Sequence, residues 1–217
     1  MVVGELFAEH ATRGLIPRRG ATAAGRHQGR KPSLRGFTIF EMLIVVTIVA
    51  IVTAIGIPSF RNTILSNRLT ATANAFVSTY NSARLSAIRR NAAVQFCSSA
   101  SSTNGSEVLG TACASETGAA YMLNADATTT TKVAEAPAMP PGLTVSSSAA
   151  LRFNGQGFAR AAVSGSGPYT GLLLDLSTSQ LGTNNRRCIY LATGSIISVC
   201  TASGTGACNA SEPTSCS

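Results

Sequence analysis

The sequence places one acid inside a long apolar run, and this acid is its most unusual charged residue. Residues 37–57 are 21 consecutive residues in which Glu41 is the only charge. A carboxylate inside lipid costs up to about 2.5–3.5 kcal/mol, so we expect a positive group to compensate it. A cut between Gly36 and Phe37 would place a new α-ammonium about one helical turn from Glu41, where the two could pair. The simpler alternative is an acid at the helix end of an ordinary membrane anchor.

Six cysteines follow the apolar run, and they predict disulfide bonds. Their even number, with no Cys-x-x-Cys spacing and no nearby histidine, is typical of proteins in an oxidising compartment. A zinc site of four cysteines is an alternative that the lack of short paired spacings disfavours. Of the fifteen connectivities, pairing neighbours in the sequence predicts Cys97–Cys113, Cys188–Cys200 across a hairpin-like turn, and Cys208–Cys216.

The residues that enzymes use are sparse after the apolar run. Both histidines, His10 and His27, precede it, which excludes a Ser-His-Asp or Cys-His arrangement in the rest of the chain. The acids there are too scattered to suggest a carboxylate pair or a calcium loop; they are Glu41, Glu107, Glu116, Asp126, Glu135, Asp175 and Glu212. There is no phosphate-binding or dinucleotide-binding fingerprint. We therefore expect no enzyme, no cofactor and no metal site.

The apolar run and the charges around it predict a membrane span. As a helix, residues 37–57 would be about 32 Å long, which matches a hydrocarbon core of about 30 Å and exceeds the apolar part of a secretory signal. Residues 1–36 carry seven Lys or Arg and two Glu, a net +5, whereas the remaining 181 residues carry only +3. The positive-inside rule then puts the N-terminus in the cytoplasm and the cysteines on the oxidising side.

Apolar residues at steps of three and four continue the helix beyond Pro58. They form one stripe, which predicts an amphipathic helix that ends near Arg90, with Asn91 as its stop; the stripe is Leu65, Leu69, Ala73, Phe76, Tyr80, Ala83 and Ala87. A helix that is apolar along one stripe needs a compact domain to cover it.

The remaining chain alternates short strand-like runs with turn residues. The strand candidates are residues 93–97, 143–145, 151–153, 171–176, 187–191 and 195–200, and the Ser/Thr-rich residues 98–106 and 127–131 are predicted to be exposed loops. Strands without helices between them favour an antiparallel sheet. The predicted class is α+β: a long N-terminal helix packed on an antiparallel β-sheet or small β-sandwich.

The start of the apolar run resembles the N-terminal signature of type IV pilins and pseudopilins. The resemblance rests on Gly36-Phe37-Thr38, on Glu41 and on the aliphatic run that follows. It implies that a prepilin peptidase cleaves after Gly36 and N-methylates Phe37, and that Glu41 pairs with a neighbour's N-terminus during assembly. The 36-residue leader is longer than is usual in that family.

Three further segments resemble the GspH/FimT pseudopilins: residues 67–97, 151–159 and 186–200. The resemblance implies the pilin fold and a structural or priming subunit of a type IV pilus or a type II secretion pseudopilus. It implies an inner-membrane protein with a cytoplasmic N-terminus and a periplasmic domain. The implied partners are the prepilin peptidase, other pilins or pseudopilins, the assembly platform and membrane lipid. The implied segments are a cleaved leader (1–36), a transmembrane helix (37–58), an amphipathic helix (59–92) and a disulfide-linked β domain (93–217).

DNA capture is the competing function. Some FimT-like proteins bind DNA through a Gly-Arg-x-Arg hairpin, but residues 194–198 here read Gly-Ser-Ile-Ile-Ser, so both arginines are absent. Other arginines could bond phosphate in their place; they are Arg186, Arg187, Arg152 and Arg160. Adjacent residues of a strand point to opposite faces, so at most one of Arg186 and Arg187 could join any patch. We therefore favour the structural role.

Overall fold

The computed structural model describes residues 36–217 apart from residues 115, 164, 215 and 217. Except for Gly36, the predicted leader lies outside the described residues. Contacts within the chain divide it into two units at the boundary between Val46 and Thr47.

One long helix, α1 (Ile39–Arg90), accounts for 52 residues. It continues through Gly56 and Pro58. It ends where predicted, because Asn91 adopts a left-handed conformation with φ 46° and the amide of Ala92 bonds back to the carbonyl of Ala87. The last turn contains Arg89 and Arg90, whose charges favour the negative end of the helix dipole.

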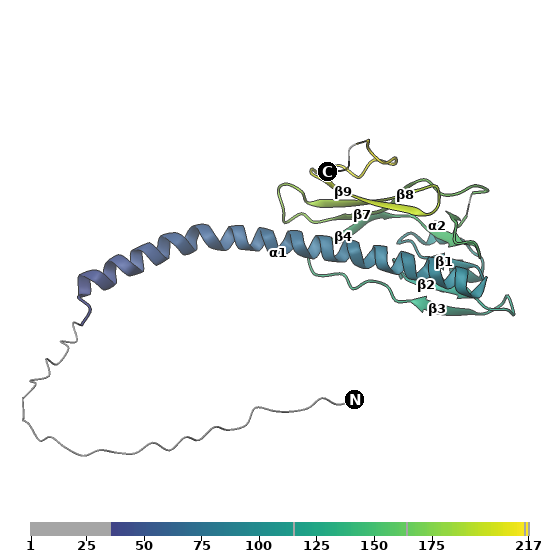
Figure 1. The fold of residues 1–217 in the computed structure, drawn as a ribbon, viewed down its shortest axis with the longest axis horizontal. Helices are drawn as coiled ribbons and strands as arrows, with labels where there is room; N and C mark the ends of the chain where they lie inside the picture. Colours follow the sequence, from purple (N-terminus) through teal and green to yellow (C-terminus); the bar gives the residue numbers. More distant parts are fainter. Residues whose placement is uncertain (1–35, 115, 164, 215, 217) are drawn as a thin grey trace, which may run out of the picture. The chain divides into compact units, whose positions relative to one another are not determined.

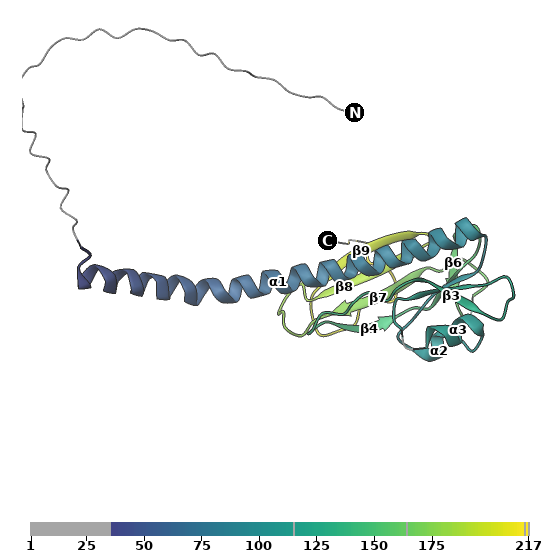
Figure 2. The same ribbon diagram turned by 90° about the horizontal axis from the view of Figure 1, so that it is seen from below.

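Two antiparallel sheets follow α1 (Figure 1), which confirms the α+β class. The five-stranded sheet has the order β3 (Thr130–Ala134), β2 (Ala120–Leu123), β1 (Val94–Phe96), β5 (Leu151–Phe153) and β6 (Ala159–Ala161). The four-stranded sheet has the order β4 (Thr144–Ser148), β7 (Gly171–Ser177), β8 (Arg186–Ala192) and β9 (Ile196–Ala202). Two short helices, α2 (Ser101–Asn104) and α3 (Val108–Cys113), lie across the five-stranded sheet from α1 (Figure 2).

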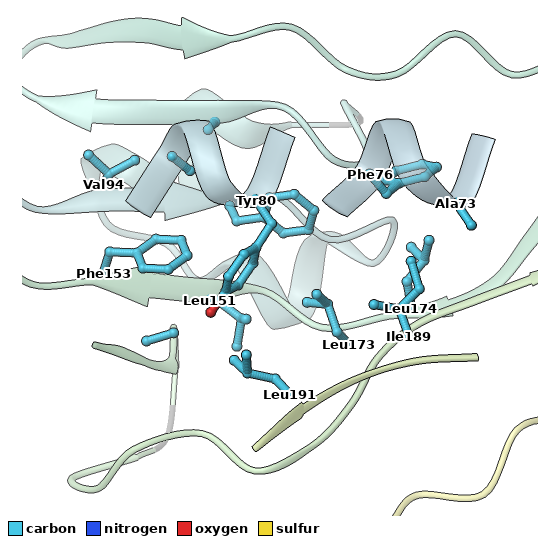
Figure 3. Close-up of a cluster of buried hydrophobic side chains, with 14 of the residues drawn as sticks. Ala73, Phe76, Tyr80, Val94, Leu151, Phe153, Leu173, Leu174, Ile189 and Leu191 are labelled. Atoms are coloured by element: carbon cyan, nitrogen blue, oxygen red, sulfur yellow. The ribbon is translucent and has the colours of Figure 1, made fainter. Parts of the chain in front are cut away.

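A single apolar core joins α1 to both sheets (Figure 3). Six of the seven predicted stripe residues are buried, and Leu65 is half-buried. Tyr80 lies at the centre, with its ring edge-on to Phe153 at a centroid distance of 4.9 Å. Its hydroxyl donates to the carbonyl of Gly194 in the β8–β9 turn at 3.4 Å. Because burial removes water from the phenol, it raises the pKa of Tyr80. The helix therefore packs against both sheets and contributes to the core that they share.

Three strands (β2, β3 and β6) and both short helices were not predicted from the sequence. β3 reads Thr-Thr-Lys-Val-Ala at a sheet edge, so it lacks the apolar alternation that predicts a strand. Residues 98–106 were predicted to be an exposed loop, but Asn104 within them is buried. Its side-chain carbonyl accepts a hydrogen bond from the backbone amide of Ser98 at 2.8 Å. Its backbone carbonyl accepts one from the side-chain amide of Gln95 at 2.8 Å. A polar segment is thus ordered by a buried amide network.

Candidate functional site

The N-terminus of α1 is the first candidate site, because it contains every residue of the predicted processing signal. Gly36, Phe37 and Thr38 precede the helix and are exposed. The hydroxyl of Thr38 accepts a bond from the amide of Glu41 at 3.1 Å, and its carbonyl accepts from the amide of Met42 at 3.2 Å. Thr38 is therefore the N-cap, and Glu41 lies in the first turn, where the helix dipole stabilises a negative charge.

The capping role of Thr38 was not among the features predicted from the sequence. The signal was present, since Thr-x-x-Glu before an apolar run is a capping-box pattern. The cap fixes the point at which the helix begins, and it leaves Gly36 and Phe37 outside the helix. The Gly36–Phe37 bond is exposed and outside the helix, where a peptidase can reach it more easily than a bond inside a helix.

The first part of α1 presents apolar side chains on all sides. Among the described residues, α1 is the one helix long and apolar enough to cross a membrane, with a mean hydropathy of 2.6 in its most apolar 18 residues. Its large side chains there are exposed, which suits lipid or neighbouring helices; they include Ile39, Met42, Ile44, Val46, Ile48, Val52 and Ile55.

Arg187 ties the second part of α1 to the four-stranded sheet. Its side chain comes from β8 and donates to the hydroxyls of Thr70 at 3.1 Å and Ser66 at 3.4 Å. The same guanidinium donates to the backbone carbonyls of Asn184 and Arg186. Only 7% of the residue is exposed, and this burial lowers the pKa of its guanidinium. Arg187 thus contributes to helix–sheet packing.

Arg186 points to the opposite face of the sheet, as expected for its neighbour in a strand. It forms an ion pair with Asp175 of β7, which is completely buried. The same carboxylate accepts from the amide of Cys208 at 3.0 Å. Burial and the negative charges of Asp175 and Glu212 raise the pKa of Tyr190, which lies on the same face of β8. The buried ion pair therefore links β7 and β8, and through the amide of Cys208 it also bonds to the residues that follow β9.

The four arginines considered for DNA binding do not form a patch. Arg186 and Arg187 are buried and bonded within the protein, so their donors cannot reach phosphate. Arg152 forms an ion pair with Glu107 and also donates to Gln95. Of these four arginines, Arg160 alone is exposed and without such a bond. Residue type and spacing suggested these candidates, but the structure uses three of the four for packing.

The disulfides differ in part from the predicted pairs. Cys97–Cys113 is present, whereas the predicted Cys188–Cys200 and Cys208–Cys216 bonds are not. The structure instead has Cys188–Cys208 and Cys200–Cys216. Cys188 and Cys200 do face each other in the β8–β9 register, but each bonds to the C-terminal tail. Pairing by sequence proximity was wrong here because it could not show that the tail turns back over the sheet.

These two bonds attach the tail, residues 203–217, to the outer face of the sheet. The tail also accepts a backbone bond from Leu172 at the carbonyl of Ala210. The thiol positions of Cys200 and Cys216 lie within 4.8 Å of a Glu212 carboxylate oxygen, a group that could in principle hold a metal ion. Since the two sulfurs are bonded to each other, only the Glu212 carboxylate remains as a ligand.

Removing the Cys188–Cys208 bond is expected to destabilise the domain. The bond closes a loop with a sequence separation of 20, so the double change Cys188→Ser and Cys208→Ser should lower the free energy of unfolding by about 3 kcal/mol. Urea denaturation of the full-length chain in detergent measures this loss. Peptide mapping without reduction checks the pairing itself, and a linked Cys188–Cys200 peptide would contradict the structure.

The geometry thus shows a capped apolar helix start, a helix packed against two sheets, and a tail held by disulfides. In the comparison with known proteins, the family model of the type II transport protein GspH matches residues 72–195. These residues run from the second part of α1 to the β8–β9 turn. No curated protein and no solved structure matches the chain.

Proposed function

Because the chain belongs to the GspH family of type II transport proteins, a family of structural pseudopilins that assemble with other pseudopilins, we propose that it is a minor subunit of a type II secretion pseudopilus. In this proposal a prepilin peptidase removes residues 1–36 and N-methylates Phe37. The mature chain then enters the pseudopilus through its apolar helix and helps to begin or complete the assembly.

The observation that carries the proposal is the start of α1. Gly36 and Phe37 lie just outside a helix capped by Thr38, and Glu41 is the only charge in the apolar run that follows. An anchor alone needs no carboxylate at this depth, because the charge costs free energy in lipid. A neighbouring α-ammonium would offset that cost and would join subunits in a fixed register.

The same features support a location in the inner membrane. The exposed apolar part of α1 suits a single span, and the leader is basic. We propose that residues 37–58 span the membrane, that the leader faces the cytoplasm, and that the domain faces the periplasm, where disulfides form. Residues 59–92 and 93–217 then form the amphipathic helix and the β domain. DNA capture has less support, since three of its four candidate arginines are bonded inside the domain.

Gly36→Ala is expected to block maturation. An added methyl group at the cleavage position should reduce processing by roughly tenfold or more, as a single methylene in a tight pocket does. Full-length chains made together with a prepilin peptidase would be compared by gel mobility and intact mass. Gly29→Ala, in the same leader, is the matched control and should be processed normally. Equal cleavage of both variants, or a mature mass that does not begin at Phe37, would count against the proposed signal.

A further inference from the structure

The charges of α1 are separated along its length. Its one acid, Glu41, lies in the first turn, and all five of its arginines lie in the last 30 residues. The sequence has no Asp or Glu between Glu41 and Glu107, so none of these arginines has an acid three or four residues away to pair with. The arginines are Arg61, Arg68, Arg84, Arg89 and Arg90.

Four of these arginines are exposed and have no partner in the described part of the chain. The ion pairs there use Lys132, Arg152 and Arg186. Arg84 differs, because it is half-buried and donates to the carbonyl of Ser195 at 3.3 Å. We call the other four residues, Arg61, Arg68, Arg89 and Arg90, the basic flank of α1.

Arg61 and Arg68, the first two residues of the basic flank, lie beside the stripe of α1 that the sheets bury. Arg61 and Arg68 are seven residues apart, so at about 3.6 residues per turn they project within about 20° of each other. The stripe that includes Leu69 and Phe76 is buried against the sheets and projects roughly 60–100° away from these two arginines, whereas Ala71, three residues after Arg68, is exposed. Figure 2 shows both sheets on one side of α1.

A second copy of the chain is a poor partner for this surface. Parallel helices of two copies would bring arginine against arginine, and the copy offers no acid between residues 42 and 106 to relieve the repulsion. Four of the six acids in the β domain are already in ion pairs, which leaves Asp126 and Glu212. Like charges brought together across an interface cost several kcal/mol and so exclude wrong partners.

Membrane lipid also fits poorly. Arg61 lies close to the end of the apolar run, but Arg68 and Arg89 lie about 16 Å and 48 Å beyond Ile57 along the helix, at about 1.5 Å per residue. Charges are screened over about 8 Å at physiological salt, so lipid headgroups would meet at most one of these arginines. A partner that contacts the whole flank must extend along α1 from Arg61 to Arg90.

We propose that the basic flank binds an acidic helix of a different pseudopilin, and that it selects this partner over a second copy of the chain. This inference rests on the proposed function, since it assumes a filament in which helices lie side by side. The partner helix would present carboxylates about seven residues apart, opposite Arg61 and Arg68. Arginine suits this role, because its planar guanidinium bonds a carboxylate through two donors.

The test uses the full-length chain with the photo-crosslinker p-benzoylphenylalanine at Ala71, an exposed position of α1 three residues after Arg68. The chain is made in cells that contain the other pseudopilins of its secretion system, and the crosslinked partner is sequenced by mass spectrometry. We expect an adduct with a different pseudopilin, at a helix that contains Asp or Glu. The adduct should fall roughly tenfold or more in the double variant Arg61→Glu and Arg68→Glu.

Arg160→Glu is the matched control, because Arg160 is exposed and lies on β6 rather than on α1. It should leave the adduct unchanged. An adduct between two copies, a lipid adduct alone, or a hetero-adduct that persists in the double variant would overturn the inference. Incorporation of the wild-type chain into the filament is measured in the same cells. If the chain is not incorporated at all, the proposed function fails; if it is incorporated without the predicted adduct, only this inference fails.

Discussion

Glu41→Ala is expected to leave the chain in the membrane but to keep it out of the pseudopilus. Removing the carboxylate makes the apolar run more apolar, so insertion should be unaffected or improved. Assembly should suffer, because a hydrogen bond to a charged group contributes about 1.5–3 kcal/mol, which corresponds to roughly a ten- to hundredfold loss of incorporation. Membrane fractionation measures insertion, and the amount of the chain in sheared, purified filaments measures incorporation.

Thr38→Ala separates charge pairing from helix capping. It removes the hydroxyl that accepts a hydrogen bond from the amide of Glu41, but it keeps the carboxylate of Glu41. The loss of an N-cap costs about 1 kcal/mol of helix stability, so incorporation should fall less than in Glu41→Ala. If Glu41→Ala were incorporated normally, the pairing account would be wrong. If both variants were equally defective, the role of Glu41 would be to start the helix.

Asp175→Ala is expected to have the largest effect on folding. Asp175 is completely buried, and its removal leaves Arg186, 8% exposed, without a counter-charge. Leaving a buried charge without its partner costs about 3–5 kcal/mol, a large part of the 5–15 kcal/mol that stabilises a typical domain. The amide of Cys208 also loses its acceptor, so the tail is weakened at the same point. Urea denaturation of the full-length chain in detergent, followed by circular dichroism, measures the loss.

Two controls distinguish the buried pair from ion pairs in general. Glu107→Ala removes the partner of Arg152, but the Glu107 side chain is 71% exposed, so stability should hardly change. The double change Asp175→Leu and Arg186→Met replaces both charges with apolar groups and should recover most of the loss. A double variant as unstable as Asp175→Ala would show that packing at this point, and not the unpaired charge, sets the cost.

Much of α1 could be predicted because its signals are local. Steps of three and four identified the stripe from Leu69 to Ala87, and Asn91 marked the end. The α+β class followed from the strand-like runs, and β5, β7, β8 and β9 lie close to where those runs were. β3 was missed because an edge strand with one polar face needs little apolar sequence.

The roles of individual side chains were harder to predict because they depend on contacts distant in sequence. From the sequence alone, Arg186 and Arg187 are two available cations. In the folded chain, Asp175 of β7 lies beside Arg186 and Thr70 of α1 lies beside Arg187. The tail cysteines were mispaired for the same reason, since no local pattern shows that Cys208 meets Cys188. Arginine and cysteine patterns predict which chemistry is available, and the topology decides where it is used.

The packing of α1 against both sheets also bears on how the protein folds. Tyr80 meets Gly194, 114 residues later, and Ser66 meets Arg187, 121 residues later. Chains whose core depends on such distant contacts fold slowly, because a long loop must close before any contact stabilises it. Until β7 and β8 arrive, the apolar stripe of α1 lacks part of its cover, and uncovered apolar surface promotes aggregation. The rate at which the late strands reach the helix therefore sets how long the newly made chain is vulnerable.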